Sequence, residues 1–168
     1  MDEIKLRPLE PEDLDELYSI ENDMELWTSG YTTVPYSRYI LHDYIANATC
    51  DIYADRQLRL MAVTCDGGNV VGIVDITDYE PRHNRAELGM VVKREYRNKG
   101  YGKLIVDKIL EYSRHVIHLH QLYVVIDERN ERALELFKNY GFEVSHSLKD
   151  WLYDGEKYGN AVFLTYFQ

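Results

Sequence analysis

The sequence predicts one α/β (α+β) domain with a central mixed, mostly antiparallel sheet of about seven strands and about four helices. Short apolar runs of strand length recur between turn-forming residues, and two of them flank the strong hairpin turn Asp66–Asn69. Other segments carry apolar residues at helical spacing. The chain of 168 residues is long enough for a sizeable core, so we expect residues 1–168 to form a single domain.

The first part of the chain predicts a strand followed by two helices. Ile4–Arg7 alternates and then meets a proline, and Glu10–Asp13 is an acidic helix start. After an irregular stretch, Ser37 can cap a second helix that runs to about Asn47. The apolar faces are Leu14, Leu17 and Tyr18 in the first helix, and Ile40, Leu41, Tyr44 and Ile45 in the second.

The middle of the chain is dominated by strands. Leu58–Thr64 and Val70–Thr77 form the predicted hairpin. A polar loop over Glu80–Arg85 leads to the next strand, Glu87–Val92, which is the fourth of the chain. Further along, Leu122–Ile126 is continuously apolar, which predicts a strand buried on both faces.

The C-terminal part predicts one more helix and two closing strands. Asn130 can cap this helix and Gly141 can end it. Phe142–Ser147 and Ala161–Phe167 then read as strands on either side of the turn-rich Asp154–Lys157. The apolar face of the helix consists of Ala133, Leu136, Phe137 and Tyr140.

The stretch Glu87–Lys103 carries the main functional signal. An apolar strand leads into the glycine-rich loop Arg97–Gly102, and a helix follows. Such a loop aims free backbone N–H groups at an anion, and its glycines let a phosphate approach the backbone. The expected helix face is Ile105, Ile109, Tyr112 and Val116. Five cations lie within eleven residues of a chain whose net charge is −10, which indicates a small polyanionic ligand: Lys93, Arg94, Arg97, Lys99 and Lys103.

Two other glycine-rich phosphate sites fit this stretch less well. A dinucleotide-binding loop needs a third glycine where Ile105 stands, and a nucleoside-triphosphate loop needs Gly-Lys-Ser/Thr, which is absent. The acidic balance of the chain also argues against a nucleic-acid partner.

The remaining composition points to a cytoplasmic protein. The cysteines, Cys50 and Cys65, have no metal or redox spacing and read as free thiols. The N-terminus does not resemble a signal peptide, and no apolar run is long enough to cross a membrane. We expect no metal site, because no carboxylate or cysteine stands at ligand spacing from the three clustered histidines, His115, His118 and His120.

The loop resembles the pyrophosphate loop of the GCN5-related N-acetyltransferase (GNAT) superfamily, whose members bind acetyl-coenzyme A. Asn130-x-x-Ala133-x-x-x-Phe137-x-x-x-Gly141-Phe142 resembles the second motif of this family. The predicted order of elements is similar over nearly the whole chain. Three short segments are most similar to the ribosomal-protein N-terminal and spermidine acetyltransferase branch: Leu6–Leu9, Ala86–Gly89 and Leu119–Leu122.

The resemblance implies a fourth strand that carries a bulge and splays away from the fifth, so that its backbone can pair with the pantetheine arm of the coenzyme. Apart from their backbone role, the side chains of this strand read as core residues. The coenzyme-binding residues that the resemblance implies are Met90, Val91, Val92, Arg97, Asn98, Lys99, Gly100, Tyr101, Gly102, Lys103, Asn130 and Phe137.

Glu87 is the candidate catalytic base, because an amine must lose a proton before it can attack a thioester. The same carboxylate could instead only attract a cationic acceptor, or be a plain surface residue. Aromatic side chains suit a cationic amine, and we expect Trp27, Tyr31 and Tyr36 to line the acceptor pocket with Glu87. Many members of the family carry at position 137 a tyrosine that protonates the leaving thiolate, so Phe137 leaves the acid unassigned; Tyr140 reads as a core aromatic residue.

The resemblance implies an N-acetyltransferase that moves the acetyl group of acetyl-coenzyme A directly to a primary amine. A polyamine, a protein N-terminus and another small amine all remain open as acceptors, and a homodimer is one option for the assembly. The alternative is a catalytically weak coenzyme A-binding sensor or interaction module, which Phe137 motivates.

Overall fold

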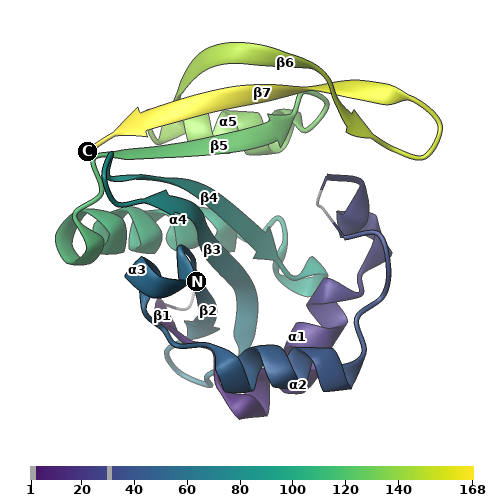
Figure 1. Ribbon diagram of the computed structural model, residues 1–168, viewed down its shortest axis with the longest axis vertical. Helices are drawn as coiled ribbons and strands as arrows, with labels where there is room; N and C mark the ends of the chain where they lie inside the picture. The colour runs from purple at the N-terminus through teal and green to yellow at the C-terminus, as the bar shows by residue number, and fades with distance from the viewer. Residues whose placement is uncertain (1–2, 30–31) are drawn as a thin grey trace.

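The computed structural model describes residues 3–29 and 32–168, and its centre is one seven-stranded sheet (Figure 1). The strand order is β1-β2-β3-β4-β5-β7-β6, and every neighbouring pair is antiparallel except β4 with β5. This confirms the predicted fold class. The strands are β1 (Ile4–Pro8), β2 (Leu58–Thr64), β3 (Val70–Glu80), β4 (Arg85–Val92), β5 (Gln121–Asp127), β6 (Glu143–Tyr153) and β7 (Tyr158–Phe167).

Five α-helices occur in the described part of the chain, one more than expected. The additional helix is a single turn that Asp51 caps through its carboxylate. The helices are α1 (Leu14–Glu21), α2 (Arg38–Asn47), α3 (Ile52–Asp55), α4 (Tyr101–Tyr112) and α5 (Glu131–Asn139). Shorter helical segments are η1 (Pro11–Asp13), η2 (Met24–Ser29), η3 (Arg94–Tyr96) and the π-type η4 (Ser113–Ile117).

The helices lie on both faces of the sheet. On one face, α1 and α2 bury Leu17 and Leu41 against Met61, Val63 and Ile73 of β2 and β3. A larger apolar core on the opposite face involves α4 and α5, whose buried members include Ile105, Ile109 and Phe137. The side chains of β2 and β3 alternate between these two cores, which explains why long stretches of both strands are buried.

Strands β4 and β5 pair only over three residues each, from Arg85–Gln121 to Glu87–Tyr123. Beyond this point the two strands diverge, as Figure 1 shows. Among the described residues, the β5-facing edge of β4 from Leu88 to Val92 therefore has no strand partner. The predicted splay is confirmed, but the predicted position of the bulge is wrong. The register of β4 with β3 is unbroken from Glu87 to Val92, and the irregularity lies on β3 between Thr77 and Glu80.

Two predictions of burial are also wrong. Leu122, Val124 and Ile126 of β5 are buried, but Tyr123 and Val125 are only half-buried, because the splay leaves their face of the sheet open. At the end of α4, Val116 is 58% exposed and Ile117 is buried instead. The π-type turn of η4 adds a residue to the helical repeat, so the apolar face shifts by one position.

Candidate active site

The predicted phosphate loop connects the end of β4 with the start of α4. Gly100 is the N-cap of α4 and has φ +85°, a left-handed conformation that favours glycine. Because the residue at this position has no side chain, it does not cap the helix itself. The Lys103 N–H already donates to the Gly100 carbonyl at 3.0 Å, and the helix dipole favours an anion at this end of α4.

Two of the five clustered cations are ion-paired with acidic side chains. Lys93 Nζ contacts Glu16 at 2.7 Å and Glu95 at 3.0 Å, and Arg94 contacts Glu25 at 2.6 Å. These contacts tie α1 and η2 to the segment that precedes the loop. The positive charge around the loop itself comes from Arg97, Lys99 and Lys103, which are the three cations that the resemblance implicates in coenzyme binding.

Arg97 also has a local structural role, because its Nε donates a hydrogen bond to the Val92 carbonyl at 2.9 Å. This bond fixes the loop to the end of β4. At the start of α4, a Cβ built on Gly102 would contact Leu136, Met90 and Val92 at 3.6–3.9 Å. The helix start is therefore packed between β4 and α5. The side chains of Met90 and Val92 pack against the α4 core, and that of Val91 packs toward α1 and α2.

The second motif forms α5 as predicted. Asn130 Oδ1 accepts a hydrogen bond from the Ala133 N–H at 3.1 Å and caps the helix. Phe137 is 5% exposed and packs edge-to-face on Phe142, with ring centroids 5.1 Å apart. Asn130 and Phe137 thus have clear structural roles, and their contact with a coenzyme stays a prediction.

Tyr140 does not replace the hydroxyl that Phe137 lacks. Its hydroxyl donates a hydrogen bond to the Lys103 carbonyl at 2.9 Å, on the side of α4. Burial and the neighbouring Asp107 carboxylate raise the pKa of Tyr140 to about 12. The ring also packs against the apolar core, as the sequence predicted.

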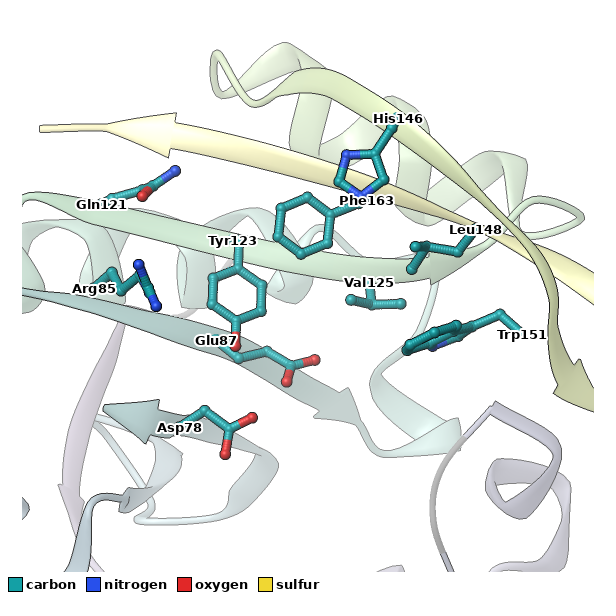
Figure 2. A pocket seen from close by; sticks show the side chains of 10 residues that line it. All are labelled: Asp78, Arg85, Glu87, Gln121, Tyr123, Val125, His146, Leu148, Trp151 and Phe163. Carbon is teal, nitrogen blue, oxygen red and sulfur yellow. The ribbon is translucent and has the colours of Figure 1, made fainter. Parts of the chain in front are cut away.

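A cavity of about 530 Å³ lies over the point where β4 and β5 part (Figure 2). Its volume is within the range of small-molecule sites. The lining residues come from β3, β4, β5, β6 and β7: Asp78, Arg85, Glu87, Gln121, Tyr123, Val125, His146, Leu148, Trp151 and Phe163.

Glu87 lines this cavity, and its catalytic or substrate-binding role stays a prediction. It is half-buried and pairs in register with Tyr123, the last paired residue of β5. Burial raises the pKa of Glu87, and the negative charge of Asp78 raises it further. A raised pKa brings the carboxylate closer to the range in which a general base works well near neutral pH.

Aromatic side chains form the opposite wall of the cavity. Phe163 of β7 stacks on Tyr123 at 4.9 Å and on His146 at 4.8 Å between ring centroids. Trp151 of β6 lies at another part of the same cavity, as Figure 2 shows. This wall was not predicted from the sequence. The alternation of Tyr123 and Val125 on β5 could have indicated it, because both side chains share one face of the strand.

Among the described residues, the predicted acceptor aromatics Trp27 and Tyr36 are not part of the cavity lining. Trp27 is in η2, where its indole N–H donates to the Glu21 carbonyl at 3.0 Å. The backbone of Tyr36 makes two hydrogen bonds with the Asn22 side chain, at 2.8 and 3.1 Å. Tyr31 lies outside the described residues. The segment η2 contacts β6, the strand that carries Trp151, and the role of Trp27 in acceptor binding stays a prediction.

In the part of the chain that the structure describes, no group of three or more His, Cys, Asp or Glu side chains is arranged to hold a metal ion. Cys50 and Cys65 are free and exposed. A search of the described helices finds none that is both apolar enough and long enough to span a bilayer.

Comparisons with known proteins agree with this fold. The family model for the acetyltransferase (GNAT) domain matches residues 3–143. The spermidine N(1)-acetyltransferase of Escherichia coli K12 is 28% identical, over 98% of this chain and 86% of the relative. The L-amino acid N-acetyltransferase AaaT of the same organism is 22% identical over 98% of both chains.

The fold is also shared with solved structures. The spermidine N-acetyltransferase from Vibrio cholerae in complex with CoA and spermine matches with a TM-score of 0.87 and 22% identity, over 99% of this chain and 96% of that one. A dodecameric structure of the Vibrio cholerae enzyme matches with a TM-score of 0.83 and 22% identity, over 99% and 94% of the two chains.

Proposed function

The chain belongs to the GNAT acetyltransferase family and is an acetyl-coenzyme A-dependent N-acetyltransferase; we propose that its acceptor is a primary amine of a polyamine. The single observation that carries this proposal is the cavity beside the splay. It places a half-buried carboxylate, Glu87, beside an aromatic wall, at the point where β4 separates from β5. Carboxylates and aromatic faces are the groups that attract ammonium ions.

The chain has features that fit the coenzyme. The glycine-rich loop offers N–H groups and cations to a pyrophosphate, and the free edge of β4 offers backbone hydrogen bonds to an amide-containing arm. The coenzyme would supply an acetyl thioester as the acyl donor. We assign Arg97–Lys103 to the phosphates and the backbone of Met90–Val92 to the arm.

Glu87 would act on the acceptor. A polyamine nitrogen is protonated at neutral pH, and only the neutral amine is a nucleophile. The Glu87 carboxylate takes this proton, and its raised pKa makes it a better proton acceptor than an ordinary glutamate. Without a hydroxyl at position 137, the thiol leaves as a thiolate, which is acceptable for a group with a pKa of about 8.5.

Phe137 motivates the alternative function, a coenzyme A-binding module with weak catalysis. Free-thiol release from acetyl-coenzyme A distinguishes the two. We expect release that depends on spermidine, spermine or 1,4-diaminobutane, and much less with a peptide N-terminus or an amino acid. Coenzyme binding without release for any amine would support the module instead. Preference for the peptide or the amino acid would keep the enzyme but reject the polyamine.

The location and assembly that we propose rest on surface features. Two exposed free thiols suit a reducing compartment such as the cytoplasm. The outer edge of the sheet is β6, an eleven-residue strand with exposed Val144, Trp151 and Tyr153, and such an edge favours pairing with another chain. We propose at least a homodimer, which light scattering of the purified protein would test.

A further inference from the structure

The bulge in β3 determines which side chain joins the cavity. Thr77 pairs with Glu87 and Glu80 pairs with Arg85, so β3 has two residues between these pairs where β4 has only Ala86. The two residues are Asp78 and Tyr79. Tyr79 is 4% exposed and packs in the core, whereas Asp78 is exposed and lines the cavity.

A regular strand would have given the opposite result. Residues 74 and 76 of β3 are buried on the α4 face, and unbroken alternation would place residue 78 on that face as well. The extra residue of the bulge reverses the alternation and delivers the Asp78 carboxylate to the Glu87 side of the sheet. Figure 2 shows both carboxylates projecting into the same cavity, from adjacent strands.

The two carboxylates of the cavity are not ion-paired within the described chain. Among the described residues, neither Asp78 nor Glu87 makes an ion pair, although Arg85 lines the same cavity. The influence of Asp78 on the pKa of Glu87 shows that the two carboxylates are electrostatically coupled. Two like charges beside an apolar wall are unfavourable unless a ligand brings positive charge.

We propose that Asp78 binds a second ammonium group of the acceptor while Glu87 serves the nitrogen that is acetylated. This inference rests on the proposed function and narrows it. The preferred acceptor then carries at least two positive charges, and a monoamine of equal length is a poor substrate. The stacked rings of Tyr123, Phe163 and His146 provide the wall along which the methylene chain between the two charges can lie.

The test uses wild type and Asp78→Asn with two acceptors that share a four-carbon chain, 1,4-diaminobutane and butylamine, of which only the first has a second amino group. Asparagine keeps the shape and tolerates the left-handed backbone of residue 78, whose φ is +49°. We expect kcat/KM for the diamine to fall at least tenfold, mainly through KM, and that for butylamine to change less than twofold. Glu80→Gln is the matched control, because it removes one carboxylate from β3 outside the cavity lining and should change neither acceptor.

Other results would overturn the proposal. If Asp78→Asn leaves the ratio of the two kcat/KM values unchanged, Asp78 does not bind the second charge. An equal fall in kcat for both amines would show that Asp78 acts only through Glu87. Asp78→Gly, which also accepts a positive φ, should reproduce the loss if Asp78→Asn folds poorly. If the wild type acetylates no amine, the proposed function fails, and calorimetry with 1,4-diaminobutane still tests Asp78: binding should weaken at least tenfold in the variant.

Discussion

The two halves of the sheet differ in what covers them. Strands β1–β4 have helices on both faces, and charged groups below α1 and α2 are paired. Arg59 donates to Asp75 through two hydrogen bonds of 2.7 and 2.9 Å and also binds Glu21. Strands β5, β7 and β6 have α5 on one face, and most of β6 is exposed. At the border of this open half, Asp78 and Glu87 line the cavity and make no ion pair within the described chain.

The two halves therefore use their carboxylates differently, for stability in the covered half and for ligand binding at the cavity. Paired carboxylates below the helices are satisfied by the fold itself, so they contribute to a fixed native structure. The carboxylates at the cavity make no ion pair among the described residues, which costs stability but lets them bind a cationic ligand. The surrounding partners of an acidic residue therefore indicate its role. An ion-paired carboxylate such as Asp75 is structural, and one without an ion pair in the described chain, such as Asp78, can bind a ligand.

The largest effect on stability is expected in the covered half. Arg59→Met should lower the free energy of unfolding by about 3 kcal/mol, because it leaves Glu21 and Asp75 half-buried without a partner. Arg85→Met is the matched control, since Arg85 makes no ion pair in the described part of the chain, and we expect a change within about 0.5 kcal/mol. Urea unfolding of both variants measures the difference. Equal losses would remove the contrast between the two halves.

The phosphate loop provides the next test, at the junction of the two halves. Saturation with coenzyme A at 100 times its Kd should stabilise the wild type by about 2.7 kcal/mol. Gly102→Glu should abolish this shift, because it adds bulk and negative charge where a pyrophosphate would bind. Gly102→Ala should keep most of it, since a Cβ at this position meets its neighbours at ordinary contact distances. Thermal unfolding with and without coenzyme A measures the shift in Tm. A wild-type shift in Gly102→Glu would place the coenzyme elsewhere.

The smallest effect is expected at Phe137. Phe137→Tyr should change turnover by less than about tenfold, or about 1.4 kcal/mol in the barrier, if the thiolate leaves without a dedicated acid. Steady-state rates with one working amine measure this. A gain well beyond tenfold would show that the missing hydroxyl limits the enzyme and would favour the weak-catalysis alternative.

The parts of the fold that the sequence predicts are those with local signals. Ser37 and Asn130 cap their helices through side-chain bonds that depend on neighbours three residues away. The glycine-rich loop is likewise a continuous segment. The cavity depends instead on relations between distant strands. Asp78 enters it because of a register shift, and His146 and Phe163 meet only because β6 pairs with β7.

Two wrong predictions of burial, at β5 and at Val116, also depend on features that are not local to the sequence. The continuous apolar run of β5 indicates burial on both faces, but the splay that exposes Tyr123 is a property of its pairing with β4 and not of its own composition. The π-type turn that exposes Val116 has no marker in the helical pattern, because the apolar spacing of α4 ends only a few residues earlier.

The catalytic role of Glu87 is tested most directly by two measurements on Glu87→Gln, turnover and stability, with Glu21→Gln from the covered half as control. Glutamine keeps the shape of Glu87 but cannot accept the proton, so turnover should fall 10²- to 10⁴-fold, roughly the range for a lost general base. The loss should shrink at high pH, where more of the amine is already neutral. Glu21→Gln should keep its turnover and lose stability, because it weakens the ion pair with Arg59.

The effects on stability should be the reverse of the effects on turnover: Glu21→Gln should lose stability and Glu87→Gln should not. The pKa of Glu87 is raised in the folded state, so its protonated form is favoured there, and ionisation opposes folding as the pH rises through that pKa. At pH 8, Glu87→Gln should therefore be at least as stable as the wild type. The prediction is a variant that is stable and inactive, beside a control that is active and less stable. A Glu87→Gln enzyme with wild-type kcat across the pH series would show that Glu87 is not the general base.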